Sequence, residues 1–225
     1  MSRPFQIVCR LIFSSILFSS IPAHSQPEAQ APAAVTFTLD FPASQPERYS
    51  IRVPSDGACR YQSSGRLSAD SDQTESFDLD FTVAAETRQK IFALANKAAY
   101  FQKDVDSHRK GIAFTGKKTL SYKDAERSGE STYNYSSNPA VLELTSLMQS
   151  LSATLEFGHR LQYDRRYQKL ALDEELKRME EMARANQLIE VAAIQPILDQ
   201  IVADQSVMNM TRARAQRLLQ GAGVR

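Results

Sequence analysis

The first half of the chain alternates apolar and polar residues with a period of two. Residues 35–41 carry an apolar side chain at every second position, which is the pattern of a strand with one buried face. The turn Pro54-Ser55-Asp56-Gly57 separates two later stretches of this kind, so we expect a hairpin there. The stretches with this period that follow the first one are 49–53, 58–62 and 77–83.

The period then changes to that of a helix. Apolar residues three and four apart predict a helix over residues 84–100. Beyond a polar link, Ile112 and Phe114 predict the start of another strand region. Alternation between residues 120 and 135 then predicts a second hairpin.

Asn138 and Pro139 are typical of a helix start, because Asn caps the first turn and Pro fits it. We expect this helix to end at Gly158. Apolar stripes at helical spacing then predict further helices, kinked or broken at Pro196. Strands followed by helices predict an α+β fold: an N-terminal antiparallel sheet of five or six strands with one packed helix, then a C-terminal helical region.

The extreme N-terminus has the parts of a secretory signal peptide: a positive flank, a short apolar core and a small-x-small end. Arg3 and Arg10 flank an apolar run of about 11 residues, whereas a spanning helix needs about 20. We expect cleavage after Ser25 and a location in the periplasm or outside the cell. The predicted segments are a signal peptide at 1–25, a flexible lead-in at 26–34, an α+β domain at 35–157 and a helical extension at 158–225.

Charge and cysteine content narrow the range of partners. Arg3 and Arg10 leave with the signal peptide, so the 27 Lys and Arg become 27 − 2 = 25, against 26 Asp and Glu. This balance points to neither nucleic acid nor an anionic membrane, and no later segment is apolar enough for stable membrane insertion. Cys59 has no second cysteine in the mature chain to pair with. It is either a small residue beside a strand or a reactive thiol.

Two motifs resemble chemical sites, and each has a simpler explanation. Residues 111–119 have the glycine and lysine spacing of a phosphate-binding loop, but Lys118 stands where that loop needs Ser or Thr, and a strand follows. Asp78 and Asp80 share a face of a predicted strand, which ordinary alternation explains without an acid pair for hydrolysis. We expect no cofactor, no metal and no catalytic residue from these motifs.

Histidine chemistry is the remaining route to an enzyme. His108 and His159 are the histidines that follow the signal peptide. An exported hydrolase with a site near one of them stays open, because such sites assemble from residues distant in sequence. It requires one ring to meet a Ser, Cys59 or a carboxylate within about 3 Å in a cleft.

The predicted second hairpin carries an aromatic and basic group. Its members, which are the candidate partner-binding residues, are Tyr122, Tyr133, Tyr135, Lys118 and Lys123. Tyrosine is enriched at recognition surfaces because it buries a large area at little entropic cost. The alternative is that these rings pack within the sheet, with their hydroxyls at its rim.

We therefore expect an exported, non-enzymatic protein that binds a protein or another partner. Binding would use the tyrosine-rich hairpin or the amphipathic C-terminal helices, and it requires a discrete apolar patch on the surface. The alternatives are the exported hydrolase and a structural homodimer joined through the C-terminal helices.

Overall fold

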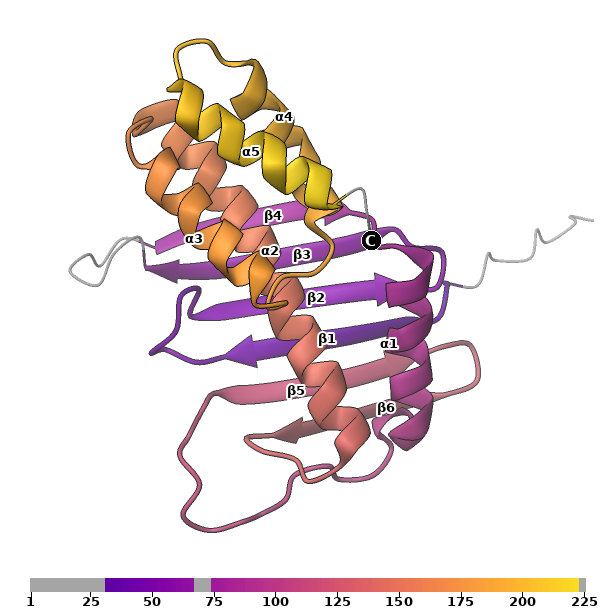
Figure 1. Cartoon of the computed structure of the whole chain (residues 1–225). Helices are drawn as coiled ribbons and strands as arrows, with labels where there is room; N and C mark the ends of the chain where they lie inside the picture. The colour runs from indigo at the N-terminus through magenta and orange to yellow at the C-terminus, as the bar shows by residue number, and fades with distance from the viewer. Residues whose placement is uncertain (1–30, 67–73, 223–225) are drawn as a thin grey trace, which may run out of the picture. The chain divides into compact units, whose positions relative to one another are not determined.

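The computed structural model describes residues 31–66 and 74–222. The predicted signal peptide at 1–25 lies outside these residues. Six strands form one antiparallel sheet in the order β4-β3-β2-β1-β5-β6, and helices follow, which confirms the predicted α+β class with a helical C-terminal region (Figure 1). The strands are β1 (Ala34–Asp40), β2 (Arg48–Pro54), β3 (Cys59–Arg66), β4 (Thr74–Phe81), β5 (Lys117–Lys123) and β6 (Ser128–Tyr133).

Alternation along the strands gives the sheet one apolar face. In β1, Val35 and Phe37 are fully buried, whereas Thr36 and Thr38, which alternate with them, are partly exposed. The register continues this face across the sheet, because Phe37 lies opposite Ile51 of β2 and Leu120 of β5. A period of two therefore places the large side chains of neighbouring strands side by side.

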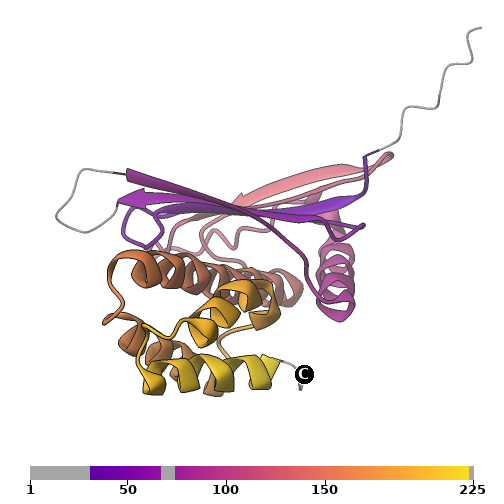
Figure 2. The same cartoon turned by 90° about the horizontal axis from the view of Figure 1, so that it is seen from above.

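The other face of the sheet is polar. Arg60 of β3 lies between two carboxylates of β4, with 3.1 Å from its guanidinium to both Asp78 and Asp80. The paired aspartates are thus ion-pair partners on an exposed surface, where such pairs contribute at most about 1 kcal/mol. No helix covers this face in the part of the chain that Figure 2 describes.

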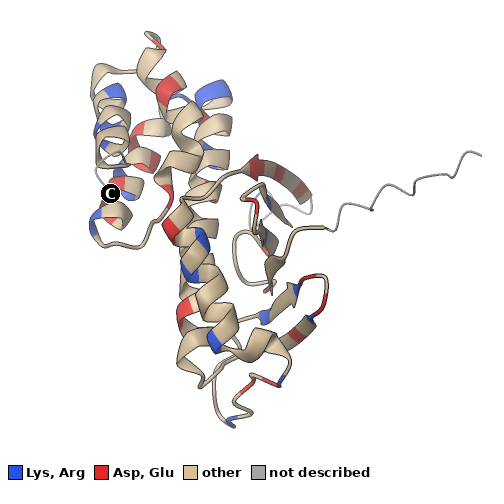
Figure 3. Cartoon of the chain, turned by 90° about the vertical axis from the view of Figure 1, so that its right-hand side faces the viewer, with Lys and Arg blue, Asp and Glu red and all other residues tan. Residues whose placement is uncertain are grey.

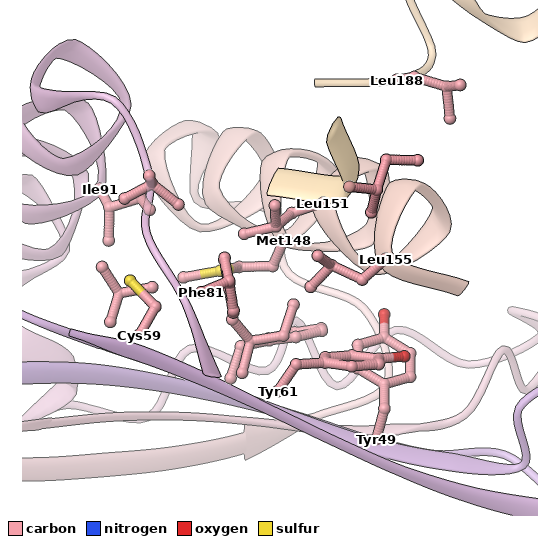
Figure 4. Close-up of a cluster of buried hydrophobic side chains, with 14 of the residues drawn as sticks. Tyr49, Cys59, Tyr61, Phe81, Ile91, Met148, Leu151, Leu155 and Leu188 are labelled. Atoms are coloured by element: carbon pink, nitrogen blue, oxygen red, sulfur yellow. The ribbon is translucent and has the colours of Figure 1, made fainter. Parts of the chain in front are cut away.

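Two helices lie against the apolar face: α1 (Ala85–Lys97) and α2 (Pro139–Tyr167). Asn138 accepts a hydrogen bond from the backbone N–H of Ala140, and Pro139 occupies the first turn, so the predicted helix start is confirmed. Cys59 is buried in the core between sheet and helices, and this burial raises the pKa of its thiol to about 11. Figure 4 shows this core, including Tyr49, Cys59, Tyr61, Phe81, Ile91, Met148, Leu151, Leu155 and Leu188.

The predicted helix end at Gly158 is wrong, because α2 continues without a break to Tyr167. Gly158 is needed for a close approach rather than for a turn. A Cβ at this position would lie 2.6 Å from Cγ2 of Ile194, which is shorter than side-chain contacts allow. A boundary between residues 157 and 158 would therefore fall inside one continuous helix.

The C-terminal helices pack on the side of α2 that faces away from the sheet (Figure 2). Pro196 lies in the first turn of α4, so the break predicted there is confirmed. The helices are α3 (Leu172–Arg184), the short 3-10 helix η2 (Val191–Ile194), α4 (Gln195–Ala203) and α5 (Asn209–Ala222). Their apolar stripes face inward, and the fully buried members are Leu172, Leu176, Met179, Leu198, Ile201 and Ala215.

The connection between α1 and β5 has no regular structure after the 3-10 turn η1 (Ala99–Phe101). The strand predicted to begin at Ile112 and Phe114 is wrong. The chain enters β5 through Gly116, whose φ is +99°, a conformation outside the strand region, and a Cβ there would lie 2.7 Å from Cβ of Phe41. Phe114 instead packs edge-on against Phe41, with the ring centres 5.9 Å apart.

Candidate binding groove

A groove of about 860 Å³ lies where the first turn of α1 meets the C-terminal ends of α3 and α5. The segment Leu188–Ala192 between α3 and α4 lies along it. Ligand sites of proteins typically have volumes of about 300–1,000 Å³ and gather where separate structural parts meet. The residues that line it include Arg184, Glu190, Ala192, Arg217 and Leu218.

Glu190 holds this junction together from a position far along the chain. Its carboxylate accepts a hydrogen bond from the backbone N–H of Ala84 at 3.0 Å and another from the hydroxyl of Thr87. Ala84 precedes α1 and has no side chain that could cap it, so Glu190 caps the helix from elsewhere in the fold. The φ of Glu190 is +54°, a left-handed conformation that this tertiary contact supports.

The opposite wall is built around a buried carboxylate. Glu180 of α3 accepts from Arg214 and Arg217 of α5, both at 2.8 Å, and its side chain is 7% exposed. Burial alone would raise the pKa of Glu180, but the hydrogen bonds from Arg217 and Arg214 outweigh it and lower the pKa. These contacts fix the ends of α3 and α5 side by side at one end of the groove.

The groove combines an apolar floor with exposed charged groups of both signs, which are Arg184 and Arg217 on one side and Glu86 of α1 on the other. Leu188 and Leu218 form part of the floor and are almost completely buried. Arg184 and Arg217 reach the rim, and their side chains remain 74% and 52% exposed. Arg217 donates to Glu180 through its Nε, and the guanidinium of Arg184 lies 3.8 Å from the same carboxylate. Guanidinium N–H groups therefore remain for an anionic group of a ligand.

A second polar cluster is buried beneath the sheet, at Glu156 of α2. Its Oε1 accepts from the hydroxyl of Tyr61 at 2.7 Å and from that of Ser63 at 2.6 Å. Tyr61 also contacts the hydroxyl of Ser152 at 3.0 Å. Burial would raise the pKa of Glu156, but hydrogen bonds from His159, Ser63 and Tyr61 outweigh it and lower the pKa. The cluster fastens α2 to β3.

His159 belongs to this cluster without completing a nucleophilic triad. Its ring lies between two carboxylates, 3.6 Å from Glu156 and 3.3 Å from Glu75, and it stacks on Phe77 with ring centres 4.1 Å apart. A triad needs the serine hydroxyl on the imidazole, whereas Ser63 donates directly to Glu156. The arrangement is that of an ion-pair and hydrogen-bond network.

The network makes stability depend on pH. Burial would lower the pKa of His159, but Glu156 and Glu75 outweigh it and raise the pKa above the usual 6.5. The stability contributed by protonated His159 is therefore complete below about pH 6.5 and is lost as the pH rises through the raised pKa. We expect His159→Gln to lower the free energy of unfolding more at about pH 6 than at about pH 9, measured by urea unfolding. Equal effects at both pH values would contradict this.

His108 lies in the connection between η1 and β5, far out in solvent. Its Nε2 is 2.7 Å from Asp104, but the two side chains are 74% and 60% exposed. The hydrogen bond to Asp104 raises the pKa of His108. This ring meets a carboxylate on an open surface rather than in a cleft. Among residues 31–66 and 74–222, no group of three or more His, Cys, Asp or Glu side chains is placed to hold a metal ion.

The tyrosines of the predicted recognition hairpin are mostly turned inward. Tyr122 and Tyr133 are 5% and 3% exposed on the apolar face, and Tyr135, just beyond β6, is half-buried. The hydroxyl of Tyr122 donates to Asp124 at 2.8 Å, and burial together with this bond raises the pKa of Tyr122 to about 12. Tyr122 and Tyr133 therefore pack within the sheet, which was the alternative to a recognition surface.

The two lysines of that hairpin differ in burial. Lys118 is 5% exposed, and its Nζ donates to the carbonyl oxygens of Thr115, Gly116 and Asn134 at 3.0–3.3 Å. Burial lowers the pKa of Lys118. Only Lys123 of the pair is exposed. The five residues therefore do not share one surface, and a partner-binding role for them stays a prediction.

Sequence reasoning did not identify the groove, because its parts come from α1, α3, α5 and a loop between them. The bonds of Glu190 to Ala84 and Thr87 span 106 and 103 positions, so no local spacing could reveal them. Across the described ranges 31–66 and 74–222, no helix has the length and apolar character needed to cross a bilayer. No protein-family model matches the chain, and no curated protein shows significant similarity to it.

Proposed function

We propose that this protein is an exported binding protein, without catalytic activity of its own, that holds a ligand in the groove between α1, α3 and α5. The ligand class that fits the lining is an apolar chain ending in an anionic group. The observation that carries the proposal is the pairing of an apolar floor with two exposed arginines at its rim. It gives the amphipathic C-terminal helices, one of the two binding elements expected from the sequence, a specific role.

Two features support binding rather than catalysis in this groove. Its charged groups are two arginines and three glutamates. Glu180 is engaged with arginines and Glu190 with the start of α1, whereas Glu86 is exposed. Neither His108 nor His159 is among the residues that line it. An apolar site with a few polar groups at one end orients a ligand and needs no reacting side chain.

The proposal is tested with a dansyl-labelled undecanoic acid as probe, added to the mature chain 26–225, which contains every described element. We expect saturable fluorescence enhancement. Ala192→Trp places a large ring at an exposed lining position and should weaken binding at least tenfold. Arg184→Ala removes one rim guanidinium and should weaken it about fivefold, which corresponds to about 1 kcal/mol for one charge-assisted contact.

The matched control is Ala213→Trp, which adds the same ring at an exposed position of α5 outside the lining residues. It should leave the dissociation constant of the probe unchanged. Absence of saturable binding, or binding that Ala192→Trp and Ala213→Trp weaken equally, would overturn the groove as the site.

A further inference from the structure

The exposed charges that line the groove have opposite signs on its two walls. Arg184 and Arg217 lie on the wall made by α3 and α5, and Glu86 lies on the other wall, in the first turn of α1. All three side chains are exposed. Figure 3 shows that the C-terminal helices carry positions of both signs, in blue and red. One bound molecule can therefore meet a cationic group on one side and an anionic group on the other.

The carboxylate of Glu86 is available to a ligand. In the part of the chain that the structure describes, it has no hydrogen-bond or ion-pair partner. Lys90, one turn further along α1, lies 2.8 Å from Glu143 of α2 and is thus already paired. Glu190, the other acid near this end of α1, accepts from the backbone N–H of Ala84. Glu86 is therefore the carboxylate that this wall can offer to a cationic group.

The opposite wall keeps a positive charge after its own ion pairs are counted. Arg184, Arg214 and Arg217 surround Glu180, and Arg214 also pairs with Asp173. Three positive charges thus meet two negative ones, and 3 − 2 leaves a charge of +1 on this wall. Because the guanidinium groups of Arg184 and Arg217 are exposed, an anionic group can bind there.

This arrangement of charges favours a head group that carries both signs. A purely anionic head would meet attraction from the arginines and repulsion from Glu86 across the groove. An ammonium group in the same head would turn that repulsion into a second attraction. A purely cationic head would meet the reverse conflict, so the two walls together discriminate against a head of either single sign.

We propose that the ligand of the groove is a zwitterionic amphiphile of the lysophospholipid type. Its phosphodiester would bind at Arg184 and Arg217, its ammonium group at Glu86, and its acyl chain over the apolar floor at Leu188 and Leu218. This inference rests on the function proposed for the groove and names the chemical class of its ligand. An acid in the first turn of a helix also favours the helix dipole. That role would affect stability and not the choice between ligands.

Isothermal titration calorimetry of the mature chain 26–225 with two lysolipids tests the proposal. Lauroyl lysophosphatidylethanolamine and lauroyl lysophosphatidylglycerol share the acyl chain and the phosphodiester, and only the first has an ammonium group. Below the critical micelle concentrations, the ethanolamine lipid should bind at least about fivefold more tightly, as one charge-assisted contact provides. Glu86→Gln should remove this preference by weakening the ethanolamine lipid alone, and circular dichroism checks that the variant is folded.

The matched control is Glu181→Gln, which neutralises an exposed glutamate of α3 outside the lining residues. It should leave the preference unchanged. The inference is overturned if the unsubstituted chain binds both lysolipids equally or binds neither. It is also overturned if Glu181→Gln removes the preference as completely as Glu86→Gln. The dansyl fatty acid tests the groove itself, so saturable binding of that probe without a lysolipid preference would overturn this inference alone.

Discussion

Replacing Glu156 by Ala should lower the free energy of unfolding by about 3 kcal/mol, because it removes the acceptor that two buried hydroxyls share and opens a small cavity. The hydroxyls of Tyr61 and Ser63 both donate to this carboxylate, and Tyr61 is completely buried. Tyr61 would keep its contact with Ser152, whereas Ser63 would lose the carboxylate to which it donates. Urea unfolding at neutral pH measures the loss.

Two further variants separate the causes of that loss. Glu156→Gln keeps an acceptor oxygen and removes the charge, so it should cost about 1 kcal/mol, less than Glu156→Ala. Glu143→Ala removes an exposed carboxylate of the same helix, which pairs with Lys90 at 2.8 Å, and should cost at most about 1 kcal/mol. If Glu156→Ala were no more damaging than Glu143→Ala, the buried cluster would contribute nothing to holding α2 on the sheet.

Local patterns predicted the sheet well because its pairing is mostly between neighbours in sequence. β1, β2, β3 and β4 follow one another as antiparallel neighbours, and β5 and β6 form a hairpin. A period of two decides which face of each strand is buried, and the structure places Phe37 and Ile51 accordingly. What the sequence could not give is the pairing of β1 with β5, since residues 41–116 separate them.

The errors have one cause in common, which is tertiary contact overriding a local signal. Glycine normally favours the end of a helix, but Gly158 lies within α2 because Ile194 leaves no room for a side chain. The alternation of Ile112 and Phe114 resembles a strand, yet the chain there has no regular structure up to Gly116, which has a φ of +99° and packs closely against Phe41 and Leu39. Each local preference is worth about 1 kcal/mol, which one packed contact can exceed.

The candidate site was hidden from sequence reasoning for a related reason. A groove is a property of distant segments, and the acids and arginines that build it are ordinary members of amphipathic helices when read one helix at a time. Glu180 and Arg184 satisfied the spacing of a solvated pair on α3, four residues apart. Only the packing of α5 against α3 shows that Glu180 is buried and shared with Arg214 and Arg217.

Substitution of Lys118 can distinguish a structural role of this lysine in packing from a partner-binding role at the surface. Its ammonium group donates to three backbone carbonyl oxygens. These bonds hold the end of the connection between η1 and β5 against Asn134, the residue that follows β6. Lys118→Met removes these bonds and should lower the free energy of unfolding by about 2 kcal/mol. Lys123→Met, at the exposed end of the same strand, should change it by less than about 0.5 kcal/mol.

Limited trypsin digestion should localise the effect of Lys118→Met. Arg109 and Lys110 are exposed in the connection that Lys118 fastens, so cleavage there should be several-fold faster in Lys118→Met than in Lys123→Met. The reason is that local opening exposes the backbone before the whole chain unfolds. Equal stability and equal cleavage in the two variants would show that the buried ammonium has no structural role, and the partner-binding hypothesis for Lys118 would then deserve the direct test.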